Sequence, residues 1–391
     1  MSDDMPVQDV LIIGGGPAGL STALHLAQSR PDLIPRILVL EKAHYPRPKL
    51  CAGALVADAE VILRRLQLDV SEVPHVDARA AHFDFAGKGL TVALPRQHVL
   101  RIIRRDEFDA WLAQKVREKG IEIREGVTVK LVTPGPQAVS VETETGTYRA
   151  RVLIGADGSN GIVRRCVLPG MPVYTARVLE VLTPLPGESS TGRGPRHKPD
   201  DAYFDFFSVP DGIAGYTWDF PTQVRGRPMR CWGIYDTNLL ADMSRPPLKE
   251  PLGVEMARLG FNLDDFDLKG HPIRWFDPFN KFSVPRVLLV GDAVGADSVF
   301  GEGISMALGY GKLAAQEVTQ ALRRDDFRFA NYKRRVLLSP LGQSLLVRWF
   351  FTYIIYPWRW KWFQFFLWRI LQPVVMVVAW LFVLNWARRM R

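Results

Sequence analysis

The chain has 391 residues, of which 47% are hydrophobic and 23% are charged, and its formal net charge is +9. This length exceeds the roughly 250–300 residues that one hydrophobic core usually serves, so we expect at least two packed units, and the composition excludes a disordered chain. Eleven basic and no acidic residues lie from Arg328 onward, which leaves the first 327 residues with a charge of −2. Such local basicity argues against nucleic-acid binding by the main body and favours a membrane surface as the partner of the C-terminal segment.

The first 41 residues have the pattern of a strand, a glycine turn, a helix and a second strand. Residues 10–13 are apolar and run into three glycines, and residues 20–29 follow with helical spacing of their apolar side chains. A second apolar run, residues 37–40, ends at Glu41. This order predicts the first β–α–β unit of a doubly wound α/β sheet.

The glycine turn satisfies the pattern GxGxxG, with Gly14, Gly16 and Gly19 in the glycine positions and Ala18 between them. Glycines let the backbone approach a pyrophosphate, which the amides and the positive end of the helix then stabilise. Glu41 would accept hydrogen bonds from the hydroxyls of an unphosphorylated ribose. The pattern alone is weak, and a purely structural turn is the alternative, but its place between strand and helix favours a dinucleotide site.

The rest of the chain contains two kinds of sequence pattern. A helix is expected over residues 105–120 and a small antiparallel element over residues 121–154, before a stretch rich in aromatics, proline and glycine with short alternating runs. A further apolar strand, residues 286–290, leads into a glycine-aspartate pair and a helix. We expect residues 1–172 to begin a first domain and residues 173–274 to form an inserted β domain. Residues 275–335 should complete the first domain, and residues 336–391 should form a C-terminal segment.

Three motifs in order resemble those of the glutathione-reductase-type flavoproteins. The glycine turn resembles their FAD motif, residues 156–159 resemble the central Asp-Gly motif, and residues 288–293 resemble the second FAD motif, in which the aspartate holds the ribityl chain. Residues 105–109 are similar to the Arg-x-x-Phe-Asp start of a helix in these proteins. The resemblance implies a Rossmann-like α/β FAD-binding domain with an inserted, mainly antiparallel substrate domain. The implied cofactor-binding residues are Gly14, Gly16, Ala18, Gly19, Glu41, Arg105, Asp157, Gly158, Gly291, Asp292, Gly303 and Ile304.

A second resemblance is narrower. Residues 215–221 resemble the Tyr-x-Trp-x-Phe-Pro motif of the geranylgeranyl reductase family, and residues 46–53 and 301–304 are similar to two other stretches of that family. Ala52 and Ser298 depart from the family pattern, which expects glycine and proline there. The resemblance implies FAD-dependent reduction of carbon–carbon double bonds in an isoprenoid or polyprenyl lipid. NADPH or another reduced donor is expected to act transiently, because no second strand-linked GxGxxG exists for it.

The residues expected to carry the chemistry lie in two of these stretches. Tyr216, Trp218 and Phe220 alternate along a strand, so their rings should share one face and form an apolar wall, although plain sheet core is the alternative. The resemblance places Cys51 near the flavin, where it is the candidate proton donor. Cys51, Tyr216 and Trp218 are the candidate catalytic residues. Lys49 joins the three aromatic residues as a candidate substrate-binding residue.

Other functions remain open on the same motifs. An FAD-dependent monooxygenase or halogenase acting on an apolar substrate would share the FAD domain, and a non-catalytic flavoprotein subunit of a membrane complex is a third reading. The seven histidines lack HExxH or comparable spacing, so no metal site is expected. The three cysteines form no CxxC, which suits a reducing, cytoplasm-facing compartment.

The C-terminal 48 residues hold seven basic side chains, no acidic ones and seven of the eleven tryptophans. Residues 370–387 are an uncharged stretch at the lower limit for a membrane-spanning helix, and Pro357 and Pro373 break the region. We expect helices on the cytoplasmic face of a membrane, as a monotopic or single-pass anchor, with a buried core helix as the alternative. All FAD motifs end by residue 304, so this segment is expected to be separable from the cofactor site.

Overall fold

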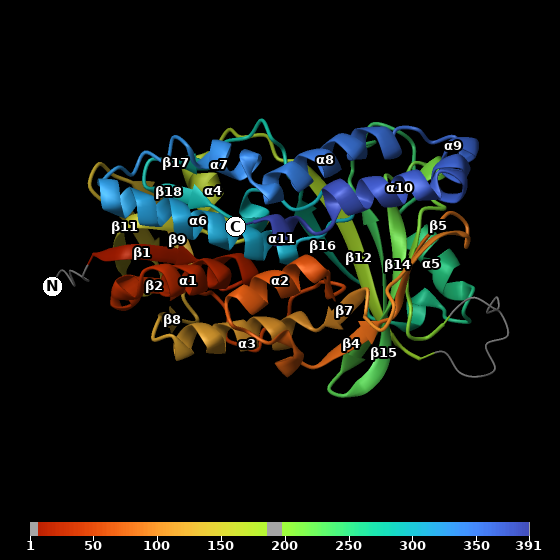
Figure 1. The fold of residues 1–391 in the computed structure, drawn as a ribbon, viewed down its shortest axis with the longest axis horizontal. Coiled ribbons are helices and arrows are strands. Elements are labelled where there is room, and N and C mark those ends of the chain that lie inside the picture. The colour runs from red at the N-terminus through yellow and green to blue at the C-terminus, as the bar shows by residue number, and fades with distance from the viewer. Residues whose placement is uncertain (1–6, 186–197, 391) are drawn as a thin grey trace.

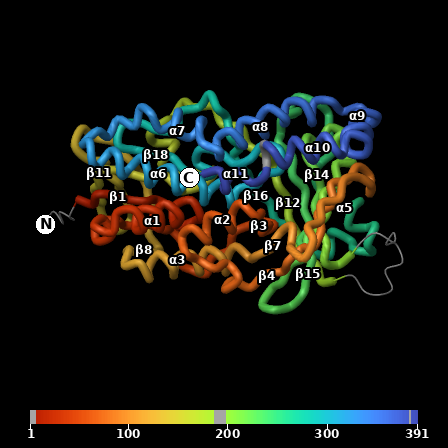
Figure 2. The backbone as a smooth tube through the Cα atoms, in the orientation of Figure 1, coloured from red at the N-terminus to blue at the C-terminus, as the bar shows by residue number. Residues whose placement is uncertain are grey.

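The structure is a computed structural model, and it describes residues 7–185 and 198–390. Figure 1 shows two sheets side by side along the long axis of the molecule, one near the N-terminus and the other near β14 and β15. The last helices lie across both of them along one side of the molecule, and the backbone trace in Figure 2 shows the same path. The expected Rossmann-like α/β domain and mainly antiparallel second sheet are both present.

The first sheet contains the predicted β–α–β unit. Within the described residues its order is β17-β18-β11-β1-β2-β8, with β10 paired to β11 and β9 to β10. The four central strands β18, β11, β1 and β2 run parallel, and their apolar side chains are buried on both faces because helices cover the sheet. The strands are β1 Gln8–Ile13, β2 Ile37–Leu40, β8 Glu122–Arg124, β9 Val129–Pro134, β10 Val139–Thr143, β11 Thr147–Gly155, β17 Ser283–Val284 and β18 Val287–Leu289.

Six helices belong to this first half of the molecule. The longest, α6, packs beside α1, and the hydroxyl of Ser21 donates a hydrogen bond across to the carbonyl of Leu308 at 2.8 Å. The helices are α1 Pro17–Ser29, α2 Ala57–Arg65, α3 Arg105–Glu118, α4 Ile162–Val167, α6 Ile304–Arg324 and α7 Tyr332–Leu338. Single 3₁₀ turns lie at Pro31–Arg36, Val70–Glu72, Val209–Asp211, Leu263–Asp265 and Gly291–Ala293.

The second sheet has the order β16-β12-β15-β14-β13-β5-β6, antiparallel except where β13 pairs with β5. Its strands are β5 Ala80–Asp84, β6 Gly89–Ala93, β12 Thr175–Pro184, β13 Ala202–Asp205, β14 Gly215–Val224, β15 Arg227–Asp236 and β16 Lys269–Arg274. A small sheet of β3 Ala54–Leu55, β7 Leu100–Ile103 and β4 His75–Ala78 adjoins it. Helix α5, Lys249–Ala257, packs on the outer face. The sheet therefore takes two strands from residues 80–93, a segment that the sequence division assigned to the first domain.

The C-terminal segment is helical, as expected. It consists of α8 Pro340–Ile355, α9 Lys361–Phe365, α10 Gln372–Val378 and α11 Trp386–Arg389, with π-helical turns at Phe366–Ile370 and Ala379–Val383. Among the described residues no single helix is long and apolar enough to cross a membrane. One pair, residues 361–370 and 372–389, meets the length and composition needed when taken together, but it is bent by 72°.

The bent pair is fixed to the body of the protein at its C-terminal end and next to its bend. Trp386 is fully buried against α6, where Gly309 leaves room for its ring. Asp58 on α2 accepts hydrogen bonds from the backbone N–H groups of Asn385 and Ala387 at 3.0 and 2.7 Å. Next to the bend, the ring of Trp368 stacks on that of Phe206, which follows β13, with ring centroids 4.0 Å apart. The segment is thus partly core, which is the alternative that the sequence left open.

We expect Trp386→Ala to lower the free energy of unfolding by about 3–5 kcal/mol, because it removes a fully buried ring. Trp380 is the matched control, since it lies in the same segment and is 64% exposed. Trp380→Ala should change stability by less than about 0.5 kcal/mol. Denaturant unfolding of both purified variants measures the difference, and equal losses would show that Trp386 is not core.

Candidate functional site

The glycine turn between β1 and α1 forms an open cradle. Gly14 has φ = +106°, and a Cβ there would lie 2.4 Å from the carbonyl oxygen of Ala156, so only glycine fits. At Gly16 a Cβ would meet only the guanidinium of Arg47, at 3.7 Å. The space beside Gly16 is therefore free, and it lies at the N-terminus of a 13-residue helix. Backbone amides and the helix dipole make this position suitable for a pyrophosphate.

Glu41 is held in place at the end of β2. Its side chain is buried, and its two carboxylate oxygens accept hydrogen bonds from the N–H groups of Gly15 at 2.8 Å and Ala43 at 3.0 Å. Each oxygen keeps a lone pair for a further donor. The structure thus presents Glu41 beside the glycine turn, as the ribose-binding prediction requires.

Two arginines share one buried carboxylate beside this cradle. Arg105 donates two hydrogen bonds to Asp109 at 2.8 and 2.9 Å, and a terminal nitrogen of Arg47 lies 3.2 Å from the same carboxylate. Arg47 also lies 3.6 Å from Glu41, so the two cations face two carboxylates, and the Nε atom of Arg47 is buried without a hydrogen-bond partner among the described residues. A terminal nitrogen of Arg47 lies next to Gly16, so its guanidinium faces the cofactor cradle. Arg47 and Asp109 lie far apart along the chain, so no local pattern in the sequence could predict their contact.

The other two motifs face the same region. In Asp157 one carboxylate oxygen accepts from the N–H of Val163 at 2.9 Å, while the other is buried and has no partner among the described residues, and burial raises the pKa of this carboxyl. Gly291 has φ = +59°, and a Cβ there would lie 2.7 Å from the side chain of Ala18, which explains why small residues meet here. Burial also raises the pKa of Asp292, while nearby Lys49 and Arg105 lower it.

The predicted residues at the start of α6 complete this region. Gly303 precedes Ile304, the first residue of α6, and a Cβ on Gly303 would lie 3.5 Å from the carboxylate of Asp292. Gly19 and Gly158 are also in place, since Gly19 lies against the carbonyl of Gly14 and Gly158 has φ = +81° next to Asp157. The open cradle, the guanidinium of Arg47 beside it and the Asp157 oxygen that is buried without a partner among the described residues together fit FAD.

The predicted aromatic wall exists and lines a cavity of about 1930 Å³. Tyr216, Trp218 and Phe220 lie on one face of β14 and are at most 5% exposed, with ring centroids 6.3 Å apart between neighbours. The Tyr216 hydroxyl donates to the carbonyl of Phe300 at 2.5 Å, and burial raises its pKa well above 10. Tyr216 thus contributes packing and orientation rather than a readily released proton.

The loop that carries Cys51 lies at the same cavity. Cys51 is half-buried and lines the cavity, and its sulfur accepts a hydrogen bond from the N–H of Gly53 at 3.4 Å. Lys49 is exposed and is not part of the lining. The structure therefore brings Cys51 together with the aromatic wall but leaves Lys49 outside the cavity.

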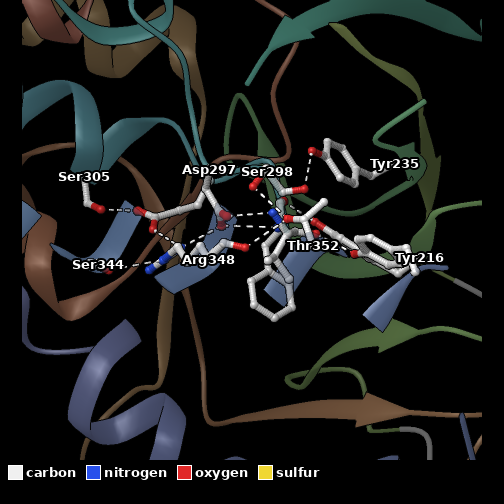
Figure 3. Close-up of polar contacts among 12 residues, drawn as sticks. Tyr216, Tyr235, Asp297, Ser298, Ser305, Ser344, Arg348 and Thr352 are labelled. Atoms are coloured by element: carbon white, nitrogen blue, oxygen red, sulfur yellow. Dashed lines mark hydrogen bonds and ion pairs between the residues drawn. The ribbon is translucent and has the colours of Figure 1, made fainter. Parts of the chain in front are cut away.

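The loop of residues 297–303 closes the cavity and is held from the C-terminal segment (Figure 3). Arg348 on α8 is 3% exposed and lies between two carboxylates, 2.6 Å from Asp297 and 3.0 Å from Glu302. The hydroxyl of Thr352 donates to that of Ser298 at 2.7 Å. These contacts differ from the expectation that the C-terminal segment is separable from the cofactor site. A single arginine in an apolar stretch was the only signal in the sequence.

Three tyrosine hydroxyls fix the backbone of the same loop. Tyr235 donates to the carbonyl of Ser298 at 3.0 Å, and Tyr356 on the C-terminal segment donates to that of Val299 at 2.6 Å. Tyr216 holds the next carbonyl along the chain. The loop is thus clamped between the second sheet and the C-terminal segment.

Comparison with known proteins gives relatives of similar length. The chain is 29% identical over 333 residues to an uncharacterized protein of Methanosarcina barkeri, covering 85% of this chain and 79% of that protein. It is 26% identical over 370 residues to the protein FixC of Escherichia coli K12, covering 87% and 83% of the two chains.

Solved structures share the fold over most of the chain. A geranylgeranyl bacteriochlorophyll reductase-like protein from Thermoplasma acidophilum superimposes with a TM-score of 0.71 at 21% identity, covering 89% of this chain and 87% of that one. The flavin-dependent brominase Bmp2 gives 0.67 at 19% identity, covering 90% of each chain. The halogenase PltM gives 0.66 at 16% identity, covering 87% and 73%.

A family model described as "FAD binding domain" matches residues 7–191. The matched range contains the glycine turn, Glu41, Arg105 and Asp157, the residues that form most of the cradle described above. The chain therefore carries an FAD binding domain, and it shares the fold of a geranylgeranyl bacteriochlorophyll reductase-like protein and of flavin-dependent halogenases over most of its length.

Proposed function

We propose that the protein reduces carbon–carbon double bonds of an isoprenoid or polyprenyl lipid at the cytoplasmic face of a membrane. The observation that carries this proposal is the continuity between the cavity and the exposed part of the C-terminal segment. Val377, Trp380 and Leu381 line the cavity, and the same side chains are 57%, 64% and 44% exposed. A long apolar chain could enter there without crossing water.

The size and lining of the cavity suit such a substrate. Its volume of about 1930 Å³ exceeds the roughly 300–1,000 Å³ of ordinary small-molecule pockets. Its lining includes the aromatic wall and Cys51 together with apolar residues of the C-terminal segment. Aromatic and aliphatic linings bury a hydrocarbon chain without leaving polar groups unpaired.

The C-terminal segment presents a broad apolar surface, which we call the apolar tail surface. Its members are Trp358, Trp360, Trp362, Phe365, Phe366, Ile370, Val374, Val377, Trp380 and Leu381, each at least 41% exposed. Exposed apolar patches of this kind mark interaction sites, and tryptophans beside arginines are typical of the membrane–water interface. The bend between the two helical pieces supports a monotopic attachment over a single crossing.

Different residues of this chain would have different roles in the proposed reaction. Bound FAD would supply hydride chemistry once it is reduced, with NADPH or another reduced compound as the transient donor. The aromatic wall would orient the lipid chain and exclude water. The N-terminus of α6, a 21-residue helix that begins at Ile304, places a positive dipole end beside Asp292 and would favour negative charge on the cofactor.

A monooxygenase or halogenase is the second candidate, because PltM and Bmp2 share the fold over most of the chain. A non-catalytic flavoprotein subunit is a third. The cavity favours the reductase, since its lining joins the exposed apolar surface of the C-terminal segment.

We expect Gly16→Val to fold but to lose at least about tenfold in FAD affinity. Its side chain would enter the free space beside the glycine turn and block contacts to a charged group, each worth about 1.5–3 kcal/mol. Gly170→Val is the control, because nothing lies within 4 Å of a Cβ there. Flavin absorbance at equal protein concentration measures occupancy. Full occupancy in Gly16→Val would contradict the cofactor site.

We expect the anaerobically reduced protein to be reoxidised by a polyprenyl lipid, with a product that gains two hydrogen atoms per reduced bond. The aromatic wall and the cavity motivate this expectation. Stopped-flow absorbance of the flavin and mass spectrometry of the lipid measure it. Labelled dioxygen or halide in the product would instead identify a monooxygenase or halogenase, and a flavin that no donor and substrate can cycle would identify a non-catalytic subunit.

We expect the double variant Trp360→Glu, Trp362→Glu to lose at least about tenfold in binding to anionic lipid vesicles. The two rings stack at 6.0 Å and are 59% and 62% exposed, and burying one ring face contributes about 2 kcal/mol at ~25 cal/mol per Å². Leu131→Glu, on β9 and 42% exposed, is the control. Vesicle co-sedimentation measures the binding of each variant. Equal binding by the double variant and by Leu131→Glu would contradict the membrane proposal.

A further inference from the structure

Glu180 lies on the face of the second sheet that carries the aromatic wall. In the sheet register Glu180 on β12 pairs with Gly233 on β15, and Gly233 pairs with Trp218 on β14. The indole of Trp218 lies over Gly233, where a Cβ would come within 2.1 Å of it. The absence of a side chain at Gly233 therefore lets the ring extend from β14 toward the strand that carries Glu180.

The carboxyl group of Glu180 is buried at the cavity and forms no ion pair with the residues that the structure describes. The residue is 3% exposed and lines the cavity together with Cys51 and Trp218. Its Oε2 atom is buried and has no hydrogen-bond partner within the described part of the chain. A buried, unpaired carboxyl group is costly when ionised, so its presence in an apolar cavity calls for a protonated form or a ligand.

The other carboxyl groups that line the cavity are engaged or exposed. Glu302 is paired with Arg348, Asp58 caps α11, Glu60 contacts His98, Asp77 contacts Arg101, and Asp200 is exposed. Glu180 is thus the lining carboxyl that is both buried and without an ion pair in the residues described by the structure.

The surroundings of Glu180 set its protonation. Burial raises its pKa to about 7, against the opposing effects of Arg104, Lys269 and the backbone amide of Cys51. His271 on β16 also lines the cavity, and burial lowers its pKa to about 4, so it is neutral at pH 7. On β15, burial raises the pKa of Cys231 well above its usual value. Near neutral pH the carboxyl can therefore both release and regain a proton.

We propose that Glu180 is the general acid that protonates the double bond of the lipid. This inference rests on the proposed function and adds the proton donor to it. The O–H bond of Glu180 breaks, and the π electrons of the double bond form a C–H bond to that proton. The neighbouring carbon receives a hydride equivalent from the reduced flavin, which is thereby oxidised. Glu180 is left as a carboxylate and regains its proton from water.

The test compares Glu180→Gln with Glu255→Gln. Glu255 is the matched control, because burial also raises its pKa to about 7, but it lies on α5 and is not part of the cavity lining. We expect Glu180→Gln to bind FAD and accept electrons normally, yet to slow reoxidation by a polyprenyl lipid by about 100-fold or more. The lipid step should lose its dependence on a group titrating near pH 7, whereas Glu255→Gln should keep the wild-type rate and pH profile.

A second readout does not depend on turnover. The infrared difference between the wild-type protein and Glu180→Gln, both without substrate, should contain a protonated carboxylic-acid band that titrates near pH 7, whereas Glu255→Gln should keep that band and lose the separate contribution of Glu255. Because folding raises this pKa from 4.5, the stability that Glu180 contributes is complete below about pH 4.5 and is lost as pH rises through about 7. The melting temperature of Glu180→Gln should therefore rise relative to that of the wild type between about pH 4.5 and pH 7, and the difference should stay constant above pH 7.

The outcomes separate the two proposals. Lipid reduction by the wild type at an unchanged rate in Glu180→Gln would overturn the acid role and leave the proposed function standing. An absent infrared band would also overturn the acid role. Failure of the wild type to reduce any polyprenyl lipid would overturn the proposed function and the acid role with it.

Discussion

The buried ion pairs of Arg348 join the two parts of the protein on which function depends. One guanidinium from α8 compensates Asp297 and Glu302, which lie at either end of the loop that closes the cavity. Removing one partner of a buried pair typically costs about 3–5 kcal/mol, because an uncompensated charge remains. The position of the C-terminal segment and the shape of the cavity are therefore linked. The segment is part of the body that forms the cavity, and it also carries the proposed contact to a lipid surface.

This linkage gives the C-terminal segment a double character. Trp386 packs as core against α6, and Trp368, close to the bend, stacks on Phe206. Between these two anchors lie Val377, Trp380 and Leu381, which belong to the apolar tail surface and also line the cavity. The two anchors hold this otherwise unfavourable exposed apolar stretch at the cavity, which is an arrangement suited to receiving a hydrophobic substrate.

Local patterns in the sequence were sufficient to predict the fold of the cofactor domain. Strand, glycine turn and helix around Gly14 are set by short-range sterics and periodicity, and the structure forms them as expected. The alternation of Tyr216, Trp218 and Phe220 likewise predicted a shared face. By contrast, the pairing of Arg348 with Asp297 spans 51 residues, and Glu180 meets the cavity only through strand register. Such long-range neighbours leave no periodic signal in one sequence. The C-terminal segment looked separable for the same reason, because its partners lie far away along the chain.

Mass spectrometry of lipids that co-purify with the protein from cells tests the central claim most directly. If the cavity receives its ligand from the bilayer, about one polyisoprenoid lipid per chain should be retained, in forms that differ by pairs of hydrogen atoms. Introducing a side chain at Gly233, over which the Trp218 ring lies, should displace that lipid while FAD stays bound. A protein isolated with full FAD and no isoprenoid, or with a small aromatic compound in the cavity, would contradict the account.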